Sequence, residues 1–241
     1  MIAEHQPTIF PPSVIAKVSS VANGRMPTAI VPTDPEQDLA ANREQFLAAV
    51  GIHPDHATQI RVTFDADHYR RYRVADVNAK GEGIGLAPGE PADAMVVTDT
   101  NHALVLPLAD CVGAIVYDPT KRVLMVSHLG RHSTEEHGAV HSVRFMQTAH
   151  DCNPANILVW ISPAVGAASY PLQKFDERGL QEVNLEQFLE AGITPEHIEV
   201  AEVDTASHDD YYSHSQFLKG NDAKRGRFAI VAMMLEQGEP A

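Results

Sequence analysis

The sequence predicts a single α/β domain in which α-helices cover a mixed β-sheet. The chain has 241 residues, and a domain holds about 150, so the length allows one large domain or two small ones. Neither a linker nor an internal repeat divides it, which favours one domain over residues 1–241. Hydrophobic residues make up 44% of the chain, enough for a packed core. Short runs rich in Val, Ile and Leu alternate with helical patterns, as is typical of α/β proteins.

The first third of the chain predicts short strands and one helix. The helix is expected to begin after Asp34, a residue type that caps helices, and to end at Gly51. After this helix, apolar and polar residues alternate in two runs, which predicts two strands with His68 in or near the turn between them. The strands expected in this part cover residues 9–10, 14–15, 60–64 and 72–74.

The rest of the chain predicts a series of buried strands and two helices. Residues 80–91 contain four glycines and two prolines and are expected to form a loop. Ser133 and Glu136 make a capping box for a helix that follows His128, and a second helix is expected over residues 185–192. Continuous apolar runs predict strands buried on both faces at residues 94–98, 102–110, 111–118 and 122–128. Another buried strand is expected within residues 157–165, ending at Pro163, and late strands are expected at 197–203 and 226–235.

Charge and cysteine content exclude several classes of protein. The chain has 18 Lys and Arg against 32 Asp and Glu, so no basic stripe for a nucleic-acid partner is expected. No apolar run approaches the roughly 18 residues that span a bilayer, so no membrane partner is expected. Prolines interrupt the N-terminal stretch where a signal peptide needs apolar residues. Two cysteines cannot build a disulfide framework, and we expect a cytoplasmic protein with reduced thiols.

Cys111 and His128 are the sharpest candidate pair. Each lies at one end of an expected buried strand, and the turn at Asp118-Pro119 lies between the two strands. A hairpin would bring Cys111 and His128 together. A reduced cysteine beside a histidine suits zinc ligation or a thiolate nucleophile. Buried cysteines and strand-end histidines are also common as purely structural residues.

The other histidines give weaker signals. The chain has 13 histidines but no nucleotide-binding glycine motif, no HExxH and no GxSxG. His137 and His141 have the spacing of a metal pair on a helix, although such a pair usually lies on a solvated face. His208 beside Asp209 and Asp210 has the composition of a cation site, but it is equally ordinary in an acidic loop.

The chain resembles the multicopper polyphenol oxidase or laccase-like family, also called the peptidoglycan editing factor or purine nucleoside phosphorylase family. The resemblance covers residues from about Asp34 to Leu235. Its most specific part is the pair of motifs "ADC" and "HxG", which are 17 residues apart here. The matching segments are Ala41-Asn42-Arg43, Ala92 to Thr98, Leu106 to Val112, Asp118-Pro119, Val126 to Gly130, Ser162 to Gly166 with Tyr170, and Arg225 to Phe228.

The resemblance implies a metal site made of a histidine, a cysteine and a second histidine. Cys111 and His128 match two of these ligands. The first ligand normally lies in the family's "QVHG" motif, where His68 is our candidate; an alternative register places Thr63 there and leaves two ligands. A site with two histidines and one thiolate keeps a fourth position open, as a catalytic zinc does, and acidifies a bound water. We therefore expect Zn²⁺, with copper as the alternative.

Several positions depart from the family pattern, so the chain resembles a divergent member of the family. The family has "AGWRG" after the second histidine, and here Arg131 and His132 stand at its Trp and Arg positions. Residues 1–33 form a divergent N-terminal segment without the family's "STRxGGVS" motif. Other departures are Ala168 and Ser169 for cysteines, Asp204-Thr205 for "CT", and Ser213 to Gln216 for "SYRRD".

The resemblance implies an enzyme that acts on purine nucleosides and phosphate, by phosphorolysis of adenosine or inosine, by deamination of adenosine, or by both. Its transferase or hydrolase chemistry would use Cys111, His68 and His128, with Asp110 as a carboxylate supporting the metal ligands. Arg43 and Arg227 are candidate phosphate or ribose contacts. The alternatives are a copper-dependent polyphenol oxidase, an enzyme that edits peptidoglycan precursors, and a non-catalytic binding protein. A multicopper oxidase needs about ten histidine ligands in clusters, and we could not assign the remaining histidines to such clusters.

Overall fold

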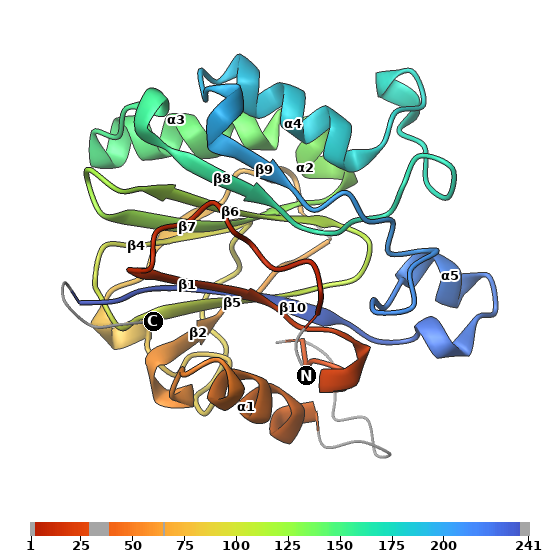
Figure 1. The fold of residues 1–241 in the computed structure, drawn as a ribbon, viewed down its shortest axis with the longest axis horizontal. Helices are drawn as coiled ribbons and strands as arrows, with labels where there is room; N and C mark the ends of the chain where they lie inside the picture. The colour runs from red at the N-terminus through yellow and green to blue at the C-terminus, as the bar shows by residue number, and fades with distance from the viewer. Residues whose placement is uncertain (1–2, 29–38, 65, 237–241) are drawn as a thin grey trace.

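Two mixed β-sheets lie face to face, with helices on both outer sides (Figure 1). The structure is a computed structural model that describes residues 3–28, 39–64 and 66–236. Helix α1 (Leu39–Ala49) covers the four-stranded sheet, and α3 (Gly138–His150) and α4 (Leu180–Glu190) cover the six-stranded sheet. The predicted α/β class is confirmed. The single mixed sheet that we expected is in fact two sheets.

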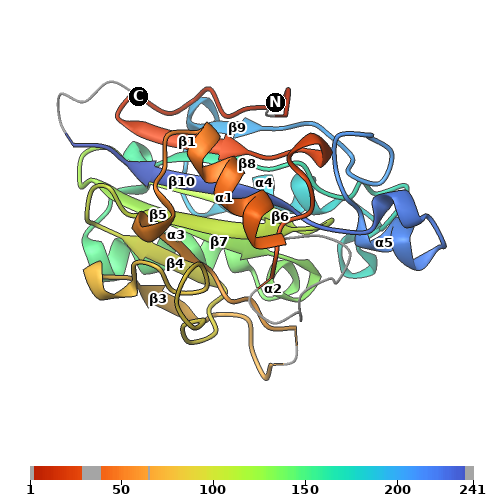
Figure 2. The same ribbon diagram turned by 90° about the horizontal axis from the view of Figure 1, so that it is seen from below.

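The four-stranded sheet has the order β1-β10-β5-β2. Its last strand in the sequence, β10, lies between β1 and β5 and is antiparallel to both, whereas β2 is parallel to β5. Side chains alternate between the two faces, so Leu106 and Ile230 belong to the core shared with the other sheet, while Val105 and Val231 pack with residues of α1. Figure 2 shows α1 lying across this sheet. The strands are β1 (Val14–Val18), β2 (Ala57–Gln59), β5 (Ala103–Leu108) and β10 (Phe228–Met234).

The six-stranded sheet has the order β3-β4-β7-β6-β8-β9. Its centre is the antiparallel β6–β7 hairpin, and its outermost pairs, β3–β4 and β8–β9, are parallel. Both faces of β6 and β7 are buried, which accounts for the continuous apolar runs of these strands in the sequence. The strands are β3 (Tyr72–Val74), β4 (Ala94–Val97), β6 (Val112–Asp118), β7 (Val123–Leu129), β8 (Leu158–Ile161) and β9 (Ile198–Val200).

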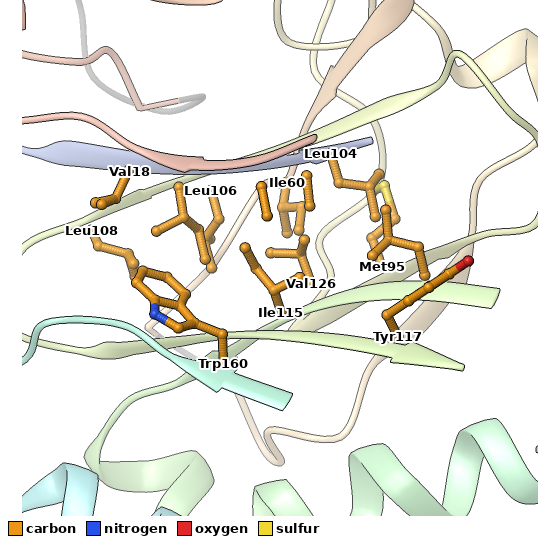
Figure 3. Close-up of a cluster of buried hydrophobic side chains, with 14 of the residues drawn as sticks. Val18, Ile60, Met95, Leu104, Leu106, Leu108, Ile115, Tyr117, Val126 and Trp160 are labelled. Atoms are coloured by element: carbon orange, nitrogen blue, oxygen red, sulfur yellow. The ribbon is translucent and has the colours of Figure 1, made fainter. Parts of the chain in front are cut away.

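The main core lies between the two sheets (Figure 3). Trp160 extends from β8 towards the four-stranded sheet and is fully buried. Ile115 is its register partner on β6, and Val126 is in turn the partner of Ile115 on β7. Leu106 and Leu108 approach from the opposite sheet. The packing of these side chains holds the two sheets together.

Two of the expected strands pair differently from the expectation. The strand expected at residues 60–64 is not formed, and β2 ends before it, at Gln59. β2 pairs with β5 in one sheet and β3 pairs with β4 in the other, so the two strands do not make a hairpin. The segment between β2 and β3 therefore crosses from one sheet to the other. Residues 9–10 are not a strand. The proposed helix cap at Asp34 lies outside the described residues.

The helices also differ from the expectation in their bounds. The helix after His128 starts at once as α2 (Arg131–Glu135), with Gly130 at its N-cap, so Ser133 lies inside it instead of capping it. His137 adopts a left-handed conformation with φ of 58°, which separates α2 from α3. Helix α4 begins five residues before the expected start, and α5 (His214–Leu218) was not predicted. Within the described part of the chain, no helix is both long and apolar enough to cross a membrane.

His102 is a fully buried histidine that makes stability depend on pH. Its Nε2 lies 2.8 Å from Thr58 Oγ1, which itself donates to the carbonyl of Ala79, so the ring donates through Nε2. Its Nδ1 has no partner among the described residues. Burial, followed by the charge of Lys80, lowers the pKa of His102 to about 4. The folded protein therefore holds His102 neutral.

We expect His102→Gln to flatten the loss of stability in acid. Between pH 6.5 and 4 the unfolded chain binds a proton at His102 and the folded chain does not, so stability falls as the pH falls, by up to about 3 kcal/mol at this group. Glutamine removes the titration and keeps an amide donor. Urea unfolding at pH 7 and pH 4.5 measures the difference, with the exposed His56→Gln as the control. Equal acid losses in both variants would contradict the assignment.

Candidate functional site

The chain crosses between the two sheets at Ala109, Asp110 and Cys111. Asp110 has a φ of 79°, a left-handed conformation that aspartate adopts more readily than most residues. Its carboxylate accepts hydrogen bonds from Thr205 Oγ1 at 2.8 Å and from the backbone N–H of Ser215 at 2.6 Å. These hydrogen bonds connect the crossover to the loop that contains Thr205 and to the start of α5. Strained conformations of this kind cluster at functional sites.

Cys111 and His128 lie at the same end of the β6–β7 hairpin. Val112 pairs with Leu129, and Gly113 pairs with His128, so the hairpin predicted from the sequence is confirmed. Both side chains point at Gly130: a Cβ on this glycine would lie 3.0 Å from Cys111 Sγ and 3.0 Å from His128 Cε1. The sulfur and the imidazole are therefore close neighbours, and the absence of a side chain at residue 130 leaves room for both.

Burial keeps this pair uncharged. It raises the pKa of the Cys111 thiol to about 12, with a further contribution from Asp110, while Arg227 acts in the opposite direction. Burial also lowers the pKa of His128 to about 4. His128 Nδ1 has no hydrogen-bond partner among the described residues. At neutral pH the pair is thus a thiol and a neutral imidazole, in the absence of a bound cation.

A cavity of about 470 Å³ opens beside Cys111 and His128. Its volume lies in the range of small-molecule sites, and its walls are mostly apolar. Phe64 packs edge-on against His128, with 5.7 Å between the ring centres. The lining residues are Phe64, Tyr69, Pro107 to Cys111, His128, Gly130 to Ser133, Val165, Tyr170, Leu180, His214, Ser215, Leu218 and Arg227.

The cavity combines cationic groups with a single carboxylate. Arg227, which directly precedes β10, lines the cavity. Burial lowers the pKa of its guanidinium, and the charges of Cys111 and Asp110 act in the opposite direction. Arg131 lines the cavity from the start of α2. Asp110 is the carboxylate, and both of its oxygens already accept hydrogen bonds. The cavity can therefore offer free N–H donors to an anion, while its aromatic walls suit a flat ring.

Two of the predicted site residues lie elsewhere. His68 is exposed, does not line the cavity, and accepts a weak hydrogen bond from the backbone N–H of Arg70 at 3.4 Å through its Nδ1. Arg43 is buried under the four-stranded sheet, where its guanidinium donates to Gln59 Oε1 and to the carbonyls of Gly83 and Ile84. These bonds give Arg43 a structural role. Asp110, Cys111, His128 and Arg227 are the predicted residues that the structure brings together.

The donors at the cavity do not match a catalytic zinc. Such a site has three protein ligands. Cys111 and His128 supply two, and in the described ranges no group of three or more His, Cys, Asp and Glu side chains is placed to hold a metal ion. Phe64, next to Thr63, packs edge-on against His128, whereas His68 lies outside the cavity lining. The described residues therefore offer two candidate metal ligands at the cavity, Cys111 and His128.

Sequence reasoning missed part of the cavity wall. Tyr69 stacks on His132, with ring centres 5.0 Å apart and an interplanar angle of 12°. His214, Ser215 and Leu218 come from α5, whose five residues carry no recognisable helical period. Arg131 and His132 were visible only as departures from a motif. Short elements and loops of this kind give little signal in a single sequence.

Comparisons with known proteins agree with this fold. A family model described as multi-copper polyphenol oxidoreductase laccase matches residues 17–235. The chain is 24% identical over 234 residues to the purine nucleoside phosphorylase YlmD of Bacillus subtilis strain 168, covering 84% of this chain and 80% of that protein. It is 25% identical over 149 residues to the purine nucleoside phosphorylase Cgl2154/cg2365 of Corynebacterium glutamicum, covering 61% of this chain and 56% of that protein.

Solved structures show the same arrangement. The hypothetical protein YfiH of Bacillus licheniformis has a TM-score of 0.81 at 20% identity, covering 96% of this chain and all of the other. YlmD from Geobacillus stearothermophilus has a TM-score of 0.79 at 20% identity and covers 94% of each chain. At these identities the likeness concerns the fold.

Proposed function

The chain belongs to the multi-copper polyphenol oxidoreductase laccase family, and from this membership we propose that it is a purine nucleoside phosphorylase-like enzyme whose substrate binds in the cavity beside Cys111 and His128. The observation that carries the proposal is the cavity itself, which combines apolar and aromatic walls with the guanidinium of Arg227. Two relatives named as purine nucleoside phosphorylases support the choice of substrate.

Arg227 has the position to bind the phosphate. Arg227 lines the cavity, and its guanidinium interacts electrostatically with Cys111 and Asp110. A guanidinium presents five N–H donors in a planar fork that matches phosphate. Phe64, Tyr69 and Tyr170 also line the cavity, and aromatic side chains suit contact with a purine ring. In this proposal the cavity holds the phosphate and the flat base side by side.

In the proposed reaction an oxygen of hydrogen phosphate attacks C1′ of the nucleoside. The bond from C1′ to the purine nitrogen breaks and leaves its electron pair on that nitrogen, and the proton of hydrogen phosphate ends on the released base. The protein contributes positioning and electrostatic stabilisation of the phosphate through Arg227. Deamination of adenosine is a second reaction that the family resemblance supports.

Metal chemistry is not part of these steps. Cys111 and His128 are the two residues that would bind Zn²⁺ or copper, and two protein donors are fewer than a catalytic site uses. This donor set favours a second candidate function, a non-catalytic protein that binds nucleosides. That candidate predicts saturable nucleoside binding without release of base.

The experiment is an assay of base release from adenosine and inosine with and without phosphate. We expect phosphate-dependent release of adenine or hypoxanthine by the wild-type chain, and a loss of about tenfold or more in Cys111→Ala, because the thiol forms the wall next to His128 and a gap there would misplace the substrate. Cys152→Ala is the matched control, since Cys152 is buried in the core beneath α3 and does not line the cavity.

Metal content is measured on the same samples. Near-stoichiometric zinc that survives dialysis against a chelator would show a third ligand and restore the three-ligand site. Turnover that is unchanged in Cys111→Ala would refute the proposed site. Binding of adenosine without any turnover would support the non-catalytic nucleoside-binding protein and contradict the proposed enzyme.

A further inference from the structure

Two guanidinium groups line the cavity from different elements. Arg227 comes from the four-stranded sheet, at the start of β10, and Arg131 comes from α2, which follows β7 of the six-stranded sheet. Among the described residues neither forms an ion pair with a carboxylate. The chain has a net charge of −14, and the cavity nevertheless brings two guanidinium groups together with one carboxylate, that of Asp110.

The acidic residues around the cavity are already engaged. Asp110 accepts hydrogen bonds at both of its oxygens. Glu135, within α2, pairs with Lys174 Nζ at 2.7 Å. Glu136 pairs with Arg70 Nε at 3.3 Å and accepts a hydrogen bond from the backbone of Tyr69. The positive charge of Arg131 is therefore left for a ligand.

Neighbouring rings hold Arg131 in place. Its Nη2 lies 3.2 Å from His132 Nε2, and because arginine can only donate, the ring of His132 accepts through Nε2. His132 in turn stacks on Tyr69. This arrangement uses one of the donors of Arg131 and leaves the others at the rim of the cavity, where the side chain is exposed.

We propose that Arg131 and His132 form a second anion subsite, which binds a phosphoryl group carried by the substrate itself. The preferred substrate is then a purine nucleoside 5′-monophosphate. The inference rests on the proposed function, in which Arg227 binds inorganic phosphate. A nucleoside with one inorganic phosphate fills a single anion position, whereas a nucleotide with inorganic phosphate fills both.

With this substrate the same bonds form and break as in the reaction of the nucleoside. Hydrogen phosphate attacks C1′, the bond to the purine nitrogen breaks with its electron pair, and the proton of hydrogen phosphate ends on the base. The other product is ribose 1,5-bisphosphate. The 5′-phosphoryl group takes no part in bond making, so the contacts of Arg131 contribute binding and orientation.

The test compares adenosine with adenosine 5′-monophosphate by isothermal titration calorimetry on the full chain at fixed ionic strength. We expect the nucleotide to bind about tenfold or more tightly, because hydrogen bonds between charged groups are among the strongest in proteins. In Arg131→Met this difference should disappear. Arg144→Met, an exposed position on α3 outside the cavity, is the matched control and should keep the difference.

Each other outcome overturns the inference in a distinguishable way. Equal affinities of the wild-type chain for the two ligands overturn it and leave the proposed function standing. If neither ligand binds, both the inference and the proposed function fail. A difference that persists in Arg131→Met places the phosphoryl group elsewhere in the cavity. Thermal unfolding of each variant shows that it is folded, and Arg131→Lys, which keeps the charge, should retain part of the preference.

Discussion

Replacing Arg227 with methionine should raise the KM for phosphate by about ten- to a hundredfold in the base-release assay. A charged group contributes roughly 1.5 to 3 kcal/mol through each hydrogen bond to an anion, and tenfold in affinity corresponds to about 1.4 kcal/mol. Methionine has a similar length and fits beside Pro107 and Leu108, which also line the cavity. The loss should therefore come from the missing guanidinium and not from a collapsed wall.

Arg225 offers a control two residues away. It is exposed, lies outside the cavity lining, and its guanidinium carbon sits 5.8 Å from the ring centre of Phe217. Arg225→Met should leave the KM for phosphate unchanged. If both variants raised it equally, the effect would be one of general charge, and Arg227 would lose its assigned role. A fall in kcat at unchanged KM would place Arg227 in stabilisation of the transition state.

Replacing Trp160 with alanine should lower the free energy of unfolding by about 3 to 5 kcal/mol. Trp160 is fully buried between the two sheets and is the largest side chain in that core (Figure 3). Alanine would leave a cavity against Leu106 and Leu108 of the opposite sheet. Urea unfolding followed by circular dichroism measures the change, since Trp160 is the chain's one tryptophan and fluorescence would be lost.

The variant Trp160→Phe shows how much of the lost stability comes from side-chain volume and how much from hydrogen bonding of the indole. The indole Nε1 is buried and has no acceptor among the described residues, so phenylalanine breaks no hydrogen bond there. We expect it to cost well under half as much as alanine, because it removes fewer atoms from the core. Equal losses for both variants would mean that the sheets close over the vacant space or that the indole makes a polar contact.

Much of the fold could be predicted because buried strands have a strong local signature. The β6–β7 hairpin follows from two apolar runs and the turn at Asp118-Pro119, and with it the approach of Cys111 to His128. The division into two sheets could not be predicted. It depends on β5 pairing with β10, whose residues are about 120 positions later in the chain, and no local pattern encodes such a pairing.

The candidate site was predictable only where it lies on regular structure. Cys111 and His128 are fixed by strand register, so their sequence positions determine their meeting. His68 lies in a segment that crosses between sheets, where a shift of a few residues redirects a side chain, and there Phe64 faces His128 instead. The sequence makes Arg43 and Arg227 equal candidates for a phosphate or ribose contact. Tertiary packing separates them, because it places Arg43 under the four-stranded sheet.

The place of β10 has a consequence for synthesis on the ribosome. All six strands of the larger sheet precede residue 201, so that sheet can form while the chain is still growing. The smaller sheet cannot, because β10 separates β1 from β5 and is made last among the described strands. Until it emerges, the apolar face that carries Trp160 lacks its cover and needs protection from aggregation. Arg227 arrives with β10, so the nascent protein gains its ligand site in the same step.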